Sequence, residues 1–178
     1  MIRLDAYFDI LTHLLCESGI RVLIFDERGV GKEAFYREWL GESEIEKMLF
    51  FTPSSLRESL CVLSSSQVRL IFGPCTGILH CASGIYNIFV AKGYPVNRLP
   101  LMITYTGKYE KEGHTAEAWW GTSPLIHCLV LRRRNSISDM VLLKDMKEDE
   151  KADAGVLLPC DQYSSEMIID FLNQHLYK

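Results

Sequence analysis

The sequence predicts an α/β protein: a Rossmann-like, three-layer domain with a mostly parallel sheet and helices on both faces. Short apolar runs alternate along the chain with amphipathic segments of helical period. Strands joined through helices pair in parallel, because such connections return the chain to the same end of the sheet. The chain has 178 residues, of which 48% are hydrophobic and 24% charged. That length and composition predict one domain over residues 1–178 with a sizeable core.

The first half of the chain opens with a helix. Leu4, Phe8, Leu11 and Leu15 recur at the spacing of one helix face, and Gly19 ends the segment. A strand over 21–26, a glycine-containing turn, a helix over 34–40 and a strand over 48–51 follow. The next helix is capped by Ser54 or Ser55, with Glu58 completing a capping box, and it leads to a strand over 68–72.

The second half continues the alternation. A helix is predicted from Thr76 to about Ala91, followed by strands over 101–105 and 125–131. Residues 132–155 are polar and charged, and they predict a long surface connection with a short edge strand over 141–143. The final predicted element is a helix over 164–177.

Charge and cysteine usage exclude several classes of protein. The formal net charge is -4, whereas a nucleic-acid-binding protein would present a basic face. No apolar run reaches the length of a membrane span, and the N-terminus lacks the pattern of a signal peptide. The six cysteines are scattered without a C-x-x-C pair, which predicts reduced thiols in a cytoplasmic protein.

Residues 73–84, GPCTGILHCASG, contain the strongest candidate for a binding site. They follow a predicted strand and open a predicted helix at Thr76 and Gly77. A helix N-terminus offers unpaired N–H groups and the positive end of the helix dipole, and a glycine lets a ligand approach the backbone. Turns at this position hold phosphates in open α/β sheets. The alternative is an ordinary strand-to-helix turn with a threonine cap.

Two further clusters of residues give weaker indications of a binding site. Cys75, His80 and Cys81 would not share one face of a helix, so no metal site is predicted. Trp119 and Trp120 could stack on a sugar or a base, but packing against the sheet is the preferred interpretation.

The segment SLRESLCVLSSSQVRLIFGPCTGILHCAS resembles the donor-binding half of the heptosyltransferase-type glycosyltransferases, the family of lipopolysaccharide core assembly. The matching residues are Ser55, Leu56 and Glu58 in the first helix and Thr76, Gly77, His80 and Ala82 in the turn and second helix. The strand and glycine-rich turn RVLIFDERGVGKEAF and the strand over 101–106 also match. The resemblance covers most of residues 1–131.

The resemblance implies the C-terminal half of a GT-B fold, which binds a nucleotide-diphosphate sugar such as ADP-heptose and needs no further cofactor. The implied donor-binding residues are Asp26, Gly29, Ser55, Gly73, Cys75, Thr76, Gly77 and His80. Some of these residues have simpler roles. His80, which would hydrogen-bond the donor or brace the turn, would otherwise be a partly buried helix histidine. Ser55 would only cap its helix, and Asp26 would lie in a solvated loop. The resemblance also implies a peripheral position at the inner membrane.

The chain departs from the family in three ways. Cys75 stands where the family has an aspartate. The acceptor half has no counterpart, so no catalytic residue is predicted, and an acceptor domain or a partner chain would have to supply one. The usual first strand of the family's domain is missing. Its two neighbours would then pair directly, or a replacement strand would come from 141–143 or from another chain. An exposed sheet edge would favour a homodimer. The alternative function is a non-catalytic or degenerate nucleotide-binding or interaction domain.

Overall fold

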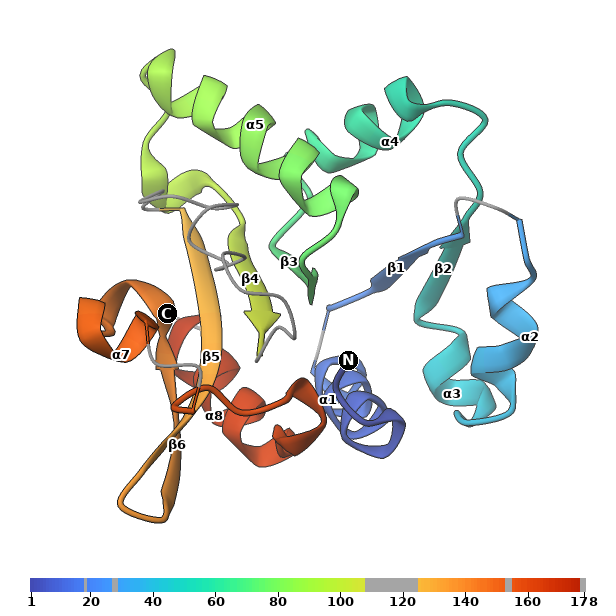
Figure 1. Ribbon diagram of the computed structural model, residues 1–178. Helices are drawn as coiled ribbons and strands as arrows, with labels where there is room; N and C mark the ends of the chain where they lie inside the picture. Colours follow the sequence, from blue (N-terminus) through green and yellow to red (C-terminus); the bar gives the residue numbers. More distant parts are fainter. Residues whose placement is uncertain (18, 27–28, 108–124, 153–154, 177–178) are drawn as a thin grey trace.

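The computed structural model describes residues 1–17, 19–26, 29–107, 125–152 and 155–176 (Figure 1). Its first elements are α1 (Leu4–Cys16), β1 (Val22–Phe25), α2 (Lys32–Arg37), α3 (Glu42–Ile45), β2 (Met48–Phe51), α4 (Leu56–Leu63), β3 (Leu70–Pro74) and α5 (Gly77–Ala91). The remaining elements are η1 (Val96–Arg98), β4 (Leu101–Thr106), β5 (Ile126–Arg134), β6 (Ile137–Leu142), η2 (Leu143–Asp145), α7 (Glu148–Ala152), η3 (Cys160–Gln162) and α8 (Ser165–His175).

The strands form two sheets. β1 and β2 pair in parallel, and β3, β4, β5 and β6 form a second sheet in that order. In the second sheet β3, β4 and β5 are parallel and β6 is antiparallel at the edge. The predicted α/β class with a mostly parallel sheet is therefore confirmed. Among the described strands, none joins β1 to β3, so the two sheets remain separate.

Helix α1 joins the two sheets on one face. Ala6 and Ile10 belong to the core cluster that contains Ile103 of β4. Phe8 and Leu11 belong to the cluster that contains Met48 of β2. Figure 1 shows α1 and α8 on one side of the strands and α4 and α5 on the other. The apolar side chains of α1 therefore pack against both sheets.

The face covered by α5 holds the other large core cluster. Leu79 and Tyr86 of α5 pack with Met102 of β4 and Val130 of β5. The Tyr86 hydroxyl donates a hydrogen bond to the Leu63 carbonyl at the end of α4, which ties the two helices together. Helix α5 therefore covers this face of β4 and β5.

Residues 132–155 correct the prediction of a long polar connection. β5 continues to Arg134, and Asn135 and Ser136, both with positive φ, turn the chain into β6. Arg132 donates hydrogen bonds to Asp139 across the hairpin and to Glu150. The polar side chains therefore pair with one another, and the strands form without an apolar pattern. Residues 141 and 142 of the short strand expected over 141–143 form the end of the longer edge strand β6, and Leu143 begins η2.

Other differences from the predictions are local. Helix α3 was not predicted, and β3 begins two residues later than expected and ends at Pro74. The predicted first and last helices are confirmed, with Ser164 capping α8 through its side chain. Trp119 and Trp120 lie outside the described residues. No helix in the described ranges combines the length and the apolar character needed to cross a membrane.

Candidate functional site

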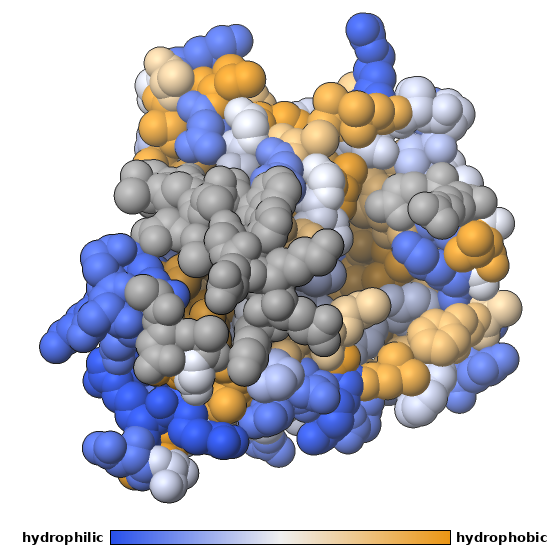
Figure 2. Space-filling view, in the orientation of Figure 1, coloured by the Kyte–Doolittle hydropathy of each residue, from blue (hydrophilic) through white to orange (hydrophobic). Residues whose placement is uncertain are grey.

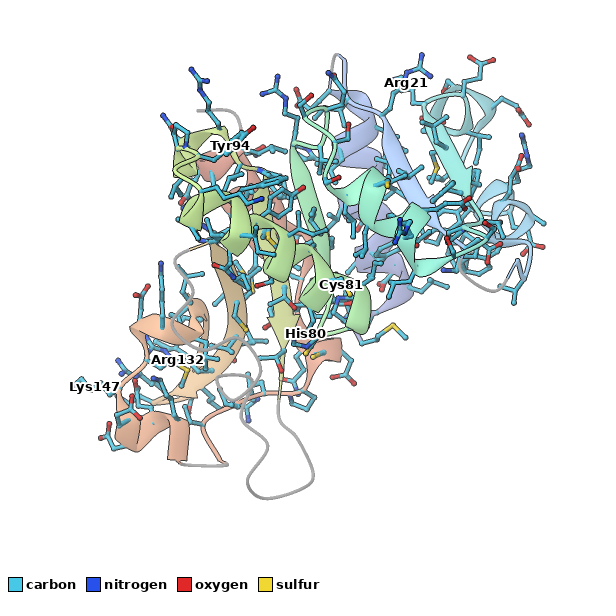
Figure 3. All side chains as sticks on the ribbon, turned by 90° about the horizontal axis from the view of Figure 1, so that it is seen from above. Arg21, His80, Cys81, Tyr94, Arg132 and Lys147 are labelled. Atoms are coloured by element: carbon cyan, nitrogen blue, oxygen red, sulfur yellow. The ribbon has the colours of Figure 1, made fainter. Side chains whose placement is uncertain are left out.

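The predicted site residues lie at or beyond the carboxyl ends of three strands. Asp26 and Gly29 follow β1, Ser55 follows β2, and the third group runs from Gly73 in β3 to His80 in α5. At the end of β1, Phe25 packs against the core cluster to which Cys75 and Ile78 also belong. A Cβ atom added to Gly29 would lie 3.5 Å from the Thr52 side chain, so the loops after β1 and β2 are in contact. Figure 3 shows His80 at the opposite end of the strands from Arg21, which precedes β1. The structure therefore brings the predicted segments to the same edge.

Asp26 closes the loop after β1. Its carboxylate is buried and accepts backbone hydrogen bonds from Val30 (3.1 Å), Gly31 (2.9 Å) and Lys32 (3.1 Å). Burial opposes ionisation of this carboxyl, but the three hydrogen bonds and the Lys32 charge outweigh it, so the pKa of Asp26 lies below its ordinary value. Asp26 therefore shapes the loop, which makes the alternative of a solvated loop residue wrong, and its role in donor binding stays a prediction.

Lys32 was not predicted as a site residue. Its ammonium group donates a hydrogen bond to the Phe25 carbonyl at the end of β1. Gly31 precedes it with a φ of +79°, a conformation that L side chains rarely adopt, and allows α2 to start there. A glycine followed by a lysine at the end of the loop between a strand and a helix is the sequence signal that could have identified it.

The turn between β3 and α5 leaves the helix N-terminus open. Thr76 is the N-cap residue of α5, yet its side chain makes no capping hydrogen bond. Gly77 is exposed, and a Cβ atom placed on it would meet nothing within 4 Å. Gly73 is buried, and its added Cβ would lie 3.4 Å from Leu79, so this glycine lets the strand and helix pack closely. The first N–H groups of a 15-residue helix are thus accessible.

Cys75 and His80 meet across this turn. The Cys75 sulfur lies 3.4 Å from His80 Nε2. The expectation that they would not share a helix face does not prevent this contact, because Cys75 precedes the helix and His80 reaches back over its first turn. The pair braces the turn. In the described ranges no three His, Cys, Asp or Glu side chains gather closely enough to hold a metal ion.

Ser55 faces its own helix. Its side-chain oxygen accepts a hydrogen bond from the Glu58 amide (3.3 Å), and the Glu58 carboxylate accepts one from the Ser54 amide (2.7 Å). The predicted capping box is therefore confirmed. The hydrogen bonds from Ser54 hold the pKa of Glu58 below its ordinary value. The Ser55 hydroxyl therefore serves as the cap of its own helix, which agrees with the simpler of the two roles considered for it.

Comparison with protein-family models, with curated proteins and with solved structures finds no match for this chain. The resemblance to heptosyltransferase-type enzymes therefore rests on the motif residues themselves and remains a prediction.

Proposed function

We propose that this chain binds the diphosphate of a nucleotide sugar and is the donor-binding half of a glycosyltransferase resembling the heptosyltransferases. The observation that supports the proposal is the open N-terminus of α5 at Thr76 and Gly77. It lies at the end of a parallel strand, where helix N–H groups and the helix dipole attract phosphate oxygens.

Each of the other site residues has a supporting role. The Cys75–His80 contact braces the turn that leads into the open helix end, and Asp26 holds the backbone at the start of α2. The Lys32 ammonium group lies at the carboxyl end of β1, where it donates a hydrogen bond to the Phe25 carbonyl, and adds positive charge at the carboxyl end of the smaller sheet. A dianionic diphosphate is favoured by such a combination of backbone amides and a cation.

Sugar transfer would require a second component. In the proposed reaction an acceptor hydroxyl displaces the nucleoside diphosphate at the anomeric carbon of the donor sugar, which calls for a group that takes the hydroxyl proton. An acceptor domain or a partner chain would supply that group together with the acceptor, a glycan of the lipopolysaccharide type.

A second candidate is a non-catalytic nucleotide-binding or interaction domain. The observation that favours it is Cys75, because its thiol contacts His80 where the family has a carboxylate that could accept hydrogen bonds from sugar hydroxyls. Binding of nucleoside diphosphate without a preference for the sugar conjugate would support this candidate.

The test is a titration with ADP, UDP and their sugar conjugates, followed by the amide NMR signals of the protein. We expect saturable shifts confined to residues 73–80 and to the loop after β1. Gly77→Asp should weaken binding by at least about tenfold, because it places a carboxylate beside the phosphates. The same change leaves the helix itself intact, since an acidic residue is favourable in the first turn.

Gly84→Asp is the matched control. Gly84 is an exposed glycine of the same helix that also has open space around it, but it lies two turns farther from the N-terminus. This variant should bind like the parent protein. A folded protein that shows no shifts at millimolar ligand, or equal effects of the two variants, would contradict the proposed function.

A further inference from the structure

The edges of β1 and β3 that face each other have no strand partner in the part of the chain that the structure describes. β1 pairs with β2 and β3 pairs with β4, and each pair is a ladder on one side only. Figure 1 shows β1 on the β3 side of its own sheet. An edge of this kind presents N–H and C=O groups that can receive another strand.

The hydrogen bonds that are present identify the groups on the open edge of β1. The amides of Val22 and Asp26 donate to carbonyls of the β2 segment (3.1 and 2.8 Å). Because backbone groups alternate along a strand, those of Leu23 and Phe25 point away from β2. The Phe25 carbonyl is bonded by Lys32, so the open edge of β1 offers mainly the Leu23 groups and the Phe25 amide.

The same argument applies to β3. The Leu101 amide donates to the Arg69 carbonyl (2.9 Å), so Arg69 and the residues two apart from it face β4. The backbone groups of Leu70 and Phe72 therefore face the other way, toward β1. On each open edge, the backbone N–H and C=O groups of every second residue are therefore directed toward the other sheet.

β1 and β3 run in the same direction, so one added strand can be parallel to both. The chain passes from β2 through α4 to β3, and a helical crossover returns it parallel. Figure 3 agrees, because Arg21 before β1 and His80 beyond β3 lie at opposite ends. A strand placed between β1 and β3 can therefore hydrogen-bond to both in parallel.

The side chains around these edges specify an apolar strand. Ile24 and Phe72 pack in the clusters of the α1 face, whereas Phe25 and Ile71 pack on the α5 face. All four residues of β1 are apolar but only half-buried. Figure 2 shows apolar surface at the bottom of a hollow between α4 and β1. A strand covered on both faces needs apolar side chains on both.

The positive charges at the amino ends of β1 and β3 favour an acidic residue at the start of the added strand. Arg21 directly precedes β1 and Arg69 directly precedes β3, and both are exposed. Within the described residues neither guanidinium group has an ion-pair partner. An acidic residue at the amino end of an added strand would lie between two unpaired cations.

We propose that β1 and β3 form a docking site for an extended segment of a partner polypeptide, which adds between them as a parallel strand. The segment begins with an acidic residue and continues with an apolar run about as long as β3, which has 5 residues. This site is separate from the nucleotide site at the end of α5, and nucleotide binding is not needed for it.

The test uses amide hydrogen exchange, read by NMR, with a synthetic peptide. The peptide has one aspartate, then alternating valine and isoleucine, then lysines for solubility. We expect it to protect the amides of Leu23, Phe25, Leu70 and Phe72. The amides of Ile24 and Ile71 should change little, because they already face β2 and β4. A peptide with a central proline should protect none of the four, since it lacks a donor and cannot extend through the site.

The arginines provide a charge-swap test. Arg21→Glu and Arg69→Glu should each weaken the aspartate peptide by roughly two- to fivefold, as expected for exposed ion pairs. A peptide with lysine in place of the aspartate should regain affinity for these variants. Both arginines are exposed, so the variants should remain folded.

Three results would overturn the proposal. One is the absence of protection at saturating peptide, and another is protection at the outer edges of β2 or β6 in place of the four amides. The third is a protein that is already dimeric without peptide and whose Leu23 and Phe25 amides are protected, since a second copy would then occupy the site. Loss of nucleotide binding affects none of these readouts.

Discussion

The two sheets of this protein differ in how completely they are covered, although both are built from apolar strands. In the four-stranded sheet, Ile103, Leu129 and Val130 have no solvent-exposed surface. In the two-stranded sheet, the four residues of β1 are all half-buried. Both sheets receive α1 on one face. The two sheets differ in strand neighbours: among the described strands, β4 has one on each side and β1 has one in all.

The comparison shows that an apolar run fixes where a strand forms but not how deeply it is buried. Burial stabilises in proportion to the apolar area removed from water, so the same side chain contributes less in β1 than in β4. Local stability should follow the same division, with β1 and β2 opening more readily than the larger sheet.

A matched pair of isoleucines tests this division with the largest expected effect. Ile103→Ala in β4 removes a fully buried side chain and should lower the free energy of unfolding by about 2–5 kcal/mol. Ile24→Ala in β1 removes a half-buried one and should cost about 1 kcal/mol. Urea unfolding of the two variants against the parent protein measures both. Equal losses would mean that the two sheets are equally well packed.

A pair of tyrosines tests the polar side of the same comparison. The buried Tyr163 hydroxyl lies 2.7 Å from the Thr106 carbonyl and 2.9 Å from the Leu129 carbonyl, to which it donates, so it ties η3 to β4 and β5. Tyr163→Phe leaves these carbonyls without that donor and should cost about 1–3 kcal/mol. Burial raises the pKa of Tyr163 far above its ordinary value, so it stays a donor.

Tyr7→Phe is the matched change beside the smaller sheet. The hydroxyl of half-buried Tyr7 lies 2.7 Å from the hydroxyl of buried Tyr36, and losing this single hydrogen bond should cost about 0.5–1.5 kcal/mol. Thermal unfolding of the two variants measures the difference. If Tyr7→Phe proved the more damaging of the two, the junction of α1 with the smaller sheet would be the better-ordered region.

The features that depend on a few neighbouring residues could be predicted from the sequence. The capping box of Ser55 and Glu58 is confirmed because the partners lie three residues apart. The turn ahead of Thr76 lies where predicted, because a β-branched run, a glycine and a helical period determine it together. The open helix end is thus the part of the candidate site that local sequence can identify.

The features that depend on distant partners could not be predicted. Arg132, Asp139 and Glu150 form ordered structure only because the hairpin brings them together. The half-exposure of β1 depends on which strands flank it, which the run RVLIFD does not encode. Whether β1 and β3 pair directly or take a replacement strand from 141–143 or another chain could not be decided from the sequence. Among the described strands β1 and β3 do not pair, and β6, which includes residues 141–142, lies beside β5 at the far edge of the larger sheet.

The smallest predicted effect concerns pH and the larger sheet alone. His127 of β5 has a buried Nδ1 that lacks a hydrogen-bond partner among the described residues, and its ring packs against Phe171 and His175. Burial, then the nearby charges of Lys144 and His175, lower the pKa of His127, while Asp145 opposes the shift.

The direction of the pH effect follows from proton binding. A histidine whose pKa is lower in the folded protein takes up its proton more readily when the chain is unfolded. Its contribution to stability is therefore complete above the ordinary value of 6.5 and is lost as the pH falls through the lower folded value. Unfolding of the parent protein and of His127→Leu between about pH 8 and pH 5 measures this contribution. The parent should lose more stability on acidification than the variant, and amide exchange should locate the loss in β5 and α8. Parallel pH profiles would show that the protonated ring is accommodated in the folded protein, and that the larger sheet is less tightly closed at β5 than at β4.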